Sequence, residues 1–173
     1  MVIDDYNIID TPIIISPSNM PFKNKINVFY DKLEEQDSIF GLYTYTGKKW
    51  VIVEHSKNNK INAEISTGGI FAILSETEPP IVKNILPASN STYKEDDLNI
   101  FKFNLYDKLS NIDYENIEIT IDGEKYFYDY IPYRKLVRCN KIKNLGKGIH
   151  SFNLKVSDKL NNEKIINHNF YIK

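Results

Sequence analysis

Short runs in which apolar and polar residues strictly alternate are the feature that most constrains this fold. Between positions 117 and 122 every second residue is isoleucine, and the residues between them are polar. The same period of two recurs between positions 150 and 156. Alternation places successive side chains on opposite faces of a strand, and no window shows a sustained helical period of 3.6. The sequence therefore predicts an all-β protein with half-buried strands.

Turn residues separate these runs at short intervals. Asp122-Gly123 is a strong hairpin signal, because both central positions of a type I′ turn need positive φ. Thr46-Gly47 is a weaker signal of the same kind. Many short strands with turns between them are typical of antiparallel β-sandwiches. The expected strands are 13–15, 25–30, 39–45, 48–55, 60–65, 70–74, 81–86, 98–105, 117–121, 124–130, 134–139, 150–156 and 164–171. Segments 31–38, 106–114 and 144–148 are expected loops.

A pair of prolines divides the chain. Pro79 and Pro80 lie between an apolar run at 70–74 and a second one that stops at Pro87. Proline has no N–H to donate to a sheet, and it holds the backbone extended. We therefore expect one β-sandwich over residues 1–77 and a second over residues 78–173, with no clear residue-level repeat between them.

Composition excludes several classes of partner. The net charge is −1, which argues against nucleic acid or an anionic membrane surface as a partner. No run approaches the roughly 18 apolar residues that span a bilayer, so we expect no membrane insertion. The residues after Met1 lack a basic start and a long apolar run, so we expect no signal peptide within this sequence. Cys139 is the only cysteine, so no disulfide forms within the chain, and we expect a small core residue there.

Two sets of motifs resemble known modules. Segments 39–45, 49–51, 65–72 and 78–81 are similar to a module that precedes an Ig-like module in secreted bacterial proteins. Asp107 with 110–113, then 121–123, 145–150, 156–158 and 161–162, resembles the Ig-like pattern itself. The pair resembles the C-terminal tandem β-sandwich modules of exported bacterial M23-type cell-wall peptidases and related surface proteins, the second module being Ig-like or fibronectin-III-like.

This resemblance implies a non-catalytic accessory module that spaces or anchors an upstream domain of the same polypeptide. It also implies a secreted or cell-envelope location and, as further partners, cell-wall polysaccharide or envelope proteins. The M23 active site uses a His-x-His pair, whereas His55, His150 and His168 are scattered here. We therefore expect no enzymatic activity from this chain.

Aromatic residues are the main candidates for ligand binding. They are Trp50, Tyr126, Tyr128, Tyr130 and Tyr133. Because side chains alternate along a strand, the aromatics of 126–133 cannot all face one core. An exposed row would stack on sugar rings or on a partner protein, which makes a carbohydrate- or peptidoglycan-binding module the alternative function. Cross-strand tyrosine pairs and an interdomain contact are the structural explanation, which we favour.

Metal sites have weaker support. Asp107, Asp113 and Asp158 lie in expected loops of the kind that some Ig-like modules use for calcium. The same residues commonly form Asx turns, and we favour that interpretation. His150 and His168 could be neighbours across strands, with Cys139 or a carboxylate completing a zinc site, but nothing in their spacing requires one. We therefore expect no cofactor, with calcium as the alternative.

Overall fold

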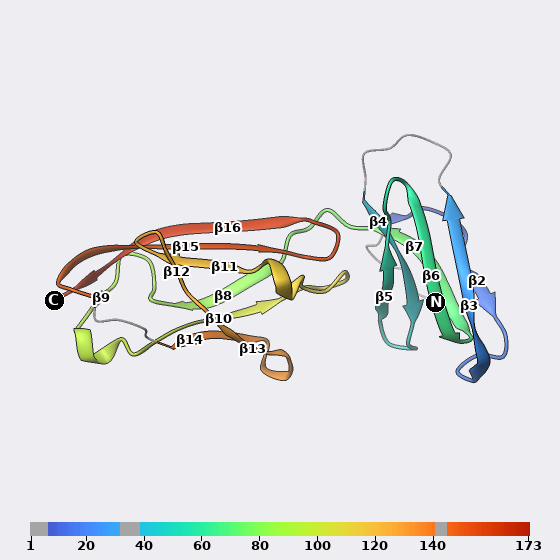
Figure 1. Cartoon of the computed structure of the whole chain (residues 1–173), viewed down its shortest axis with the longest axis horizontal. Helices are drawn as coiled ribbons and strands as arrows, with labels where there is room; N and C mark the ends of the chain where they lie inside the picture. Colours follow the sequence, from blue (N-terminus) through green and yellow to red (C-terminus); the bar gives the residue numbers. More distant parts are fainter. Residues whose placement is uncertain (1–6, 32–38, 141–144) are drawn as a thin grey trace. The chain divides into compact units, whose positions relative to one another are not determined.

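The computed structural model describes residues 7–31, 39–140 and 145–173, and these residues form an all-β protein (Figure 1). The fold class predicted from alternation is confirmed. The chain divides into two compact units, residues 1–78 with 159–161 and residues 79–158 with 162–173. The helical elements in the described segments are short 3-10 turns, and none is long and apolar enough to cross a membrane.

Unit 1 contains two sheets. Its strands are β1 (Asn7–Ile8), β2 (Ile13–Ile15), β3 (Pro21–Asp31), β4 (Phe40–Tyr45), β5 (Trp50–His55), β6 (Lys60–Thr67) and β7 (Gly69–Ser75). One sheet has the order β1-β7-β4-β5, and β2 also pairs with β7. The other sheet consists of β3 and β6. The hairpin predicted at Thr46-Gly47 connects β4 to β5, which pair antiparallel.

The core of unit 1 follows from alternation on β6. Ile61, Ala63 and Ile65 are buried, while the residues between them are exposed. They pack with Phe40, Leu42, Phe71 and Ile73 from the other sheet. The two sheets thus bury one apolar interior between them, as in a sandwich.

Gly68 joins two strands of different sheets. β6 pairs with β3, whereas β7 pairs with β4, so the chain changes sheets between them. A Cβ atom at Gly68 would collide with the backbone carbonyl oxygens of Ile15 and Pro17. Glycine is required here because two backbone segments approach closely. The connection at Gly68 is therefore a change of sheet.

Unit 2 is a larger sandwich. Its strands are β8 (Ile81–Leu86), β9 (Thr92–Tyr93), β10 (Ile100–Tyr106), β11 (Glu118–Ile121), β12 (Glu124–Lys125), β13 (Asp129–Ile131), β14 (Leu136–Asn140), β15 (Gly148–Ser157) and β16 (Glu163–Ile172). The 3-10 turns are η1 (Glu95–Asp97), η2 (Tyr114–Asn116) and η3 (Pro132–Arg134). One sheet has the order β13-β14-β10-β8, and the other has the order β12-β11-β15-β16-β9 (Figure 1).

This strand order is that of an immunoglobulin-like domain. β8, β10, β14 and β13 occupy the positions of Ig strands A, B, E and D, and β11, β15 and β16 occupy those of C, F and G. β12 takes the position of C′ beside β11. β9 pairs in parallel with β16, so the segment that begins with β8 contributes to both sheets. The B–F disulfide of antibody domains has no counterpart, because Cys139 lies on β14.

The core of unit 2 is built from the inner positions of both sheets. Phe101, Phe103 and Leu105 alternate on β10, and Phe152, Leu154 and Val156 alternate on β15. All six are at most 2% exposed. Both strands therefore direct every second side chain into the core.

One predicted strand is wrong. The run 124–130 was expected to be a single return strand after the Asp122-Gly123 turn. Only β12 pairs with β11, while β13 pairs with β14 in the opposite sheet. Residues 126–128 cross between the sheets, and Tyr126 becomes part of the core on the way. Propensity alone shows no break here, because three aromatics in succession favour a strand. Part of the loops predicted at 31–38 and 144–148 lies outside the described residues.

Truncating the core of unit 2 should destabilise it strongly. Leu154→Ala and Phe103→Ala each remove a large side chain that is at most 2% exposed. We expect a loss of about 2–5 kcal/mol in the free energy of unfolding, from lost burial and the remaining cavity. Urea denaturation measures this, with Ile165→Ala, at a side chain 57% exposed, as the control. Equal midpoints for the core and control variants would contradict the assignment of faces.

Candidate functional site

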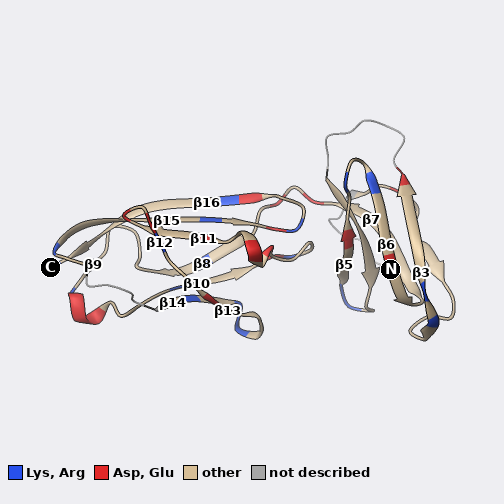
Figure 2. Cartoon of the chain, in the orientation of Figure 1, with Lys and Arg blue, Asp and Glu red and all other residues tan. Residues whose placement is uncertain are grey.

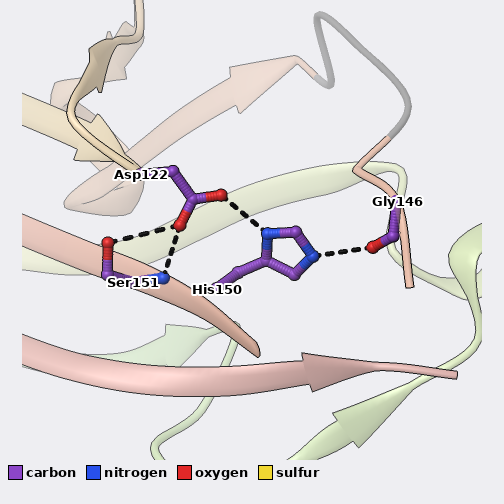
Figure 3. Close-up of polar contacts among 4 residues, drawn as sticks. All are labelled: Asp122, Gly146, His150 and Ser151. Atoms are coloured by element: carbon purple, nitrogen blue, oxygen red, sulfur yellow. Dashed lines mark hydrogen bonds and ion pairs between the residues drawn. The ribbon is translucent and has the colours of Figure 1, made fainter. Parts of the chain in front are cut away.

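One polar cluster of unit 2 joins two turns to one strand. His150 lies on β15, Asp122 lies in the turn after β11, and Gly146 precedes β15 (Figure 3). Nδ1 of His150 is 2.7 Å from Oδ2 of Asp122, and its Nε2 is 2.7 Å from the carbonyl oxygen of Gly146. The cluster borders a pocket of about 250 Å³ that is lined by Ile121, Asp122, Glu124, Tyr126, Leu145, Gly146 and His150.

The hairpin turn positions the carboxylate of Asp122. Asp122 and Gly123 have φ of 52° and 83°, as the sequence predicted for this turn. The Asp122 amide donates to the carbonyl oxygen of Ser151, at 3.0 Å. In return, Oδ1 of Asp122 accepts hydrogen bonds from the Ser151 amide at 2.7 Å and the Ser151 hydroxyl at 3.3 Å. One carboxylate oxygen is thus engaged by β15, which leaves the other for His150.

Both ring nitrogens of His150 face acceptors. Neutral imidazole carries only one N–H, so it can donate to the carboxylate or to the Gly146 carbonyl but not to both. The imidazolium ion donates to both. The side chain is 11% exposed, and the ring of Phe170 lies 5.5 Å away between centroids. This geometry favours the charged ring.

The pKa values of the pair move in opposite directions. Burial by itself would lower the pKa of His150, but the hydrogen bonds to Asp122 and Gly146 and the charge of Asp122 outweigh it and raise that pKa. Burial by itself would raise the pKa of Asp122, but the hydrogen bonds from His150 and Ser151 outweigh it and lower that pKa. Each group therefore stabilises the charged form of the other.

This cluster holds the three residue types of a serine hydrolase in a different arrangement. In a catalytic triad the serine hydroxyl bonds to the imidazole, and the carboxylate lies behind the ring. Here the Ser151 hydroxyl bonds to Asp122, and the second imidazole nitrogen bonds to a backbone carbonyl. Nothing in this geometry activates the hydroxyl. The cluster instead fastens the β11–β12 turn to the segment before β15. The sequence alone did not pair His150 with Asp122.

The candidate ligand-binding aromatics are placed very differently from one another. Trp50 and Tyr126 are buried, at 5% and 7% exposure, and offer no open ring face. Tyr128 and Tyr130 are half-buried. Tyr133 is 81% exposed. Phe127, which was not among the candidates, is 89% exposed because its neighbour Tyr126 points into the core.

The half-buried tyrosines make contacts within unit 2. The Tyr128 hydroxyl donates to the carbonyl oxygen of Tyr114, at 2.7 Å. The rings of Tyr130 and Tyr114 stack at 4.6 Å between centroids. Burial, together with Tyr114, raises the pKa of Tyr130 to about 12, so its hydroxyl stays protonated. These contacts tie the segment around β13 to η2, which agrees with a structural role for these two residues.

Of the calcium candidates, the structure brings together Asp107 and Asp158. Oxygens of their carboxylates lie within 4.8 Å of each other. Oδ1 of Asp107 accepts hydrogen bonds from the amides of Leu109 and Asn111, at 2.8 and 2.9 Å, which is an Asx-type turn. Asp158 is fully buried and accepts two hydrogen bonds from Asn162, at 2.9 and 2.8 Å. These bonds are the turn chemistry that the sequence suggested.

Asp113 serves a separate role. Its carboxylate accepts a hydrogen bond from the Glu115 amide at 3.2 Å and another from the Asn116 side chain at 2.6 Å, and so it caps η2.

Burial raises the pKa of Asp158. Hydrogen bonds from Asn162 and Ser110 oppose this rise, and the charge of Asp107 adds to it. A cation would relieve that repulsion, but neighbouring donors already occupy both Asp158 oxygens.

Each of the three residues considered as zinc ligands has another role in the structure. Nε2 of His168 is 2.8 Å from the carbonyl oxygen of Pro87, and its ring stacks on Phe152. His150 is bound to Asp122. Cys139 is 1% exposed, and burial, with the charge of Asp129, raises the pKa of its thiol to about 12. A thiol with that pKa is protonated at neutral pH and is a poor ligand and nucleophile.

Comparison with known proteins gave only distant structural similarity. No family model matches the sequence. No curated protein matches it. Among solved structures, dimeric latent PorU from Porphyromonas gingivalis is similar over 79% of this chain, with 12% identity and a TM-score of 0.44. The similar region is 20% of the PorU chain, so the present chain spans about a fifth of that protein.

Stability should depend on pH through His150. Because its folded pKa is raised, the stability that it contributes is complete below the unfolded value near 6.5 and is lost as pH rises through the folded pKa. His150→Gln should lower the free energy of unfolding at pH 6 by about 1–3 kcal/mol, the usual contribution of charge-assisted hydrogen bonds. It should also flatten the decrease of Tm between pH 6 and pH 9.

Thermal melts at several pH values measure this effect. His55→Gln, at a half-buried histidine of unit 1 that lies outside the cluster, is the matched control. A His150→Gln protein with the same pH profile as the unchanged chain would show that folding does not shift the pKa of His150, and would contradict this prediction.

Calcium should not stabilise the chain. The Asp107 and Asp158 carboxylates already accept hydrogen bonds from nearby amides. The free energy lost with these hydrogen bonds would offset the free energy gained by binding an ion. We expect Tm to be the same in 5 mM calcium and in EDTA. Differential scanning calorimetry measures this. A rise in Tm that Asp107→Asn abolishes would establish a calcium site.

Proposed function

We propose that this chain is a non-catalytic accessory module of an exported bacterial protein. Its two β units would space or anchor a neighbouring domain of the same polypeptide, such as an M23-type peptidase domain. The observation that carries the proposal is the His150 cluster, the most enzyme-like group in unit 2. Its imidazole, carboxylate and serine bond to one another and to backbone, which is structural use.

The Ig-like sandwich of unit 2 supports a spacing or anchoring role. Its core is continuous across both sheets, and its longest hairpin, β15–β16, is paired along its whole length. Extensive pairing and burial make such a unit resist local opening. Ig-like sandwiches also host many unrelated functions, so the fold does not name the partner. The proposed location is the secreted fraction or the cell envelope, and the proposed partners are upstream domains and envelope components.

An assay on cell walls tests the absence of catalysis. Purified chain is incubated with suspended peptidoglycan, with lysozyme as the positive control. We expect no fall in turbidity and no release of soluble fragments. Release of fragments that His150→Gln abolishes would overturn the proposal and show that the cluster is catalytic.

Binding to carbohydrate or peptidoglycan is the second candidate function. The observation that favours it is the pair of open aromatic rings at Phe127 and Tyr133, which are 89% and 81% exposed. The guanidinium carbon of Arg134 lies 5.4 Å from the centre of the Tyr133 ring. Large exposed aromatics of this kind stack on sugar rings or on partner proteins.

Removing the open tyrosine should weaken such binding. Tyr133→Ala should reduce co-sedimentation with insoluble peptidoglycan by about three- to tenfold, as expected for one aromatic contact worth roughly 0.5–1.5 kcal/mol. Tyr171→Ala, at a residue 39% exposed on the other sheet, is the control. No sedimentation of the unchanged chain would exclude peptidoglycan as the ligand and leave the spacer proposal standing.

A further inference from the structure

The outer side of the β13-β14-β10-β8 sheet is strongly basic. Strands β8, β10, β13 and β14, with η3 and the residue after it, contain five cationic side chains and one carboxylate. The cationic residues are Lys83, Lys102, Arg134, Lys135 and Arg138, and the acidic one is Asp129. We call this surface the basic face.

The other sheet of unit 2 has no such excess. Its strands carry Lys125, Lys155 and Lys164 against Glu118, Glu124 and Glu163. There Lys125 pairs with Glu118 at 3.6 Å, and Lys155 pairs with Glu163 at 2.6 Å. Residues 79–173 contain 15 Lys and Arg against 12 Asp and Glu, a net charge of +3, whereas residues 1–78 contain 7 against 11. The near-zero charge of the whole chain therefore does not reflect the difference between the two sheets of unit 2. Figure 2 colours the Lys and Arg positions blue and the Asp and Glu positions red.

Cations on the basic face stand close together. Lys102 on β10 is directly opposite Arg138 on β14. Like charges in directly opposed positions destabilise a sheet. Nε of Arg138 is 3.3 Å from a carboxylate oxygen of Asp129, and this ion pair offsets the charge of Arg138. Within the part of the chain that the structure describes, Lys83, Lys102 and Lys135 have no carboxylate partner.

Tyr106 holds two of these lysines over one ring. Nζ of Lys135 is 4.4 Å from the ring centre, and Nζ of Lys83 is 5.8 Å from it. The negative face of an aromatic ring attracts ammonium groups. Both ammonium groups thus interact with a neutral residue, so their charge remains available to an external anion.

The backbone beneath these lysines is held in uncommon conformations. Lys135 has φ of 51°, a left-handed conformation that non-glycine residues rarely adopt, and its amide donates to the carbonyl oxygen of Pro132 at 3.0 Å. Asn84 has φ of 53° beside the irregular register of β8 against β10. Its side-chain amide donates to Oδ1 of Asn104 at 2.9 Å, and Asn104 donates to the Lys135 carbonyl at 3.3 Å.

We propose that the basic face binds an acidic polysaccharide. The lysines and Arg138 supply charge for carboxylate groups, and their positions on three adjacent strands suit repeated charges along a polymer. The Asn84–Asn104 pair supplies amide groups for hydroxyls, and Tyr133 beside Arg134 supplies an open ring for a sugar. This inference rests on the second candidate function, glycan binding, and assigns to it a ligand class and a surface.

Other anions fit less well. A nucleic-acid-binding domain is usually strongly basic overall, whereas the net charge of residues 79–173 is only +3. A membrane-binding surface commonly adds apolar side chains that enter the headgroup region. Apart from the open ring of Tyr133, the basic face combines its charges with side-chain amides.

Affinity electrophoresis in native gels tests the proposal. The full chain is run in gels that contain polygalacturonate, a carboxylated polysaccharide, or neutral dextran. We expect retardation by polygalacturonate that weakens with added salt, and no retardation by dextran. The double variant Lys83→Gln with Lys102→Gln should bind at least tenfold more weakly.

Two further variants make the test specific. Lys135→Asn removes an ammonium group while keeping a residue that tolerates positive φ, and it should weaken binding several-fold. Lys164→Gln, which removes one charge from the other sheet, is the control and should bind as the unchanged chain does. Unchanged melting temperatures establish that each variant is folded.

Several outcomes would overturn the proposal. They are no retardation by polygalacturonate, an equal loss in the control variant, or tighter binding to duplex DNA or to phosphatidylglycerol vesicles. The peptidoglycan sedimentation assay separates the two hypotheses. Sedimentation with peptidoglycan without retardation by polygalacturonate would support the second candidate function and would refute the basic face as its binding site. A chain that does neither refutes both.

Discussion

Burial between the two facing sheets of unit 2 is the interaction on which the rest of that unit depends. β10 and β15, in opposite sheets, each direct alternate side chains inward, and these residues are almost completely removed from water. Burial of one large apolar side chain contributes roughly 1.5–3 kcal/mol, far more than a surface ion pair. The Ig-like strand order follows, because every strand must bring one apolar face to this interior.

That constraint determines where polar chemistry can occur. His150 takes an inward position at the end of β15, where the interior meets the β11–β12 turn, and a buried ring there needs partners. Asp122 and the Gly146 carbonyl supply them. Asp158, fully buried at the other end of β15, is satisfied by Asn162 across the hairpin turn. The same requirement for hydrogen-bond satisfaction explains both clusters without catalysis.

The outer faces of the two sheets do not have to bury apolar side chains, and the two faces differ in how their charges are arranged. One sheet of unit 2 pairs its charges across strands, which is ordinary surface chemistry. The basic face places Lys102 opposite Arg138 and gathers two lysines over Tyr106, an arrangement that sheet stability does not favour. An arrangement that costs stability in the free chain is a reason to expect a ligand. The exposed rings near the same sheet are consistent with a role at a surface.

Local patterns in the sequence determined the all-β class, most strand positions and the Asp122-Gly123 turn, because period and turn chemistry act over a few residues. Only the tertiary structure decided that 124–130 divides between two sheets and that Tyr126 is buried while Tyr133 is exposed. It also decided the contact of His150 with Asp122 and the gathering of the basic face from separate strands. Those outcomes depend on strand pairing between distant segments, and no local pattern encodes such pairing.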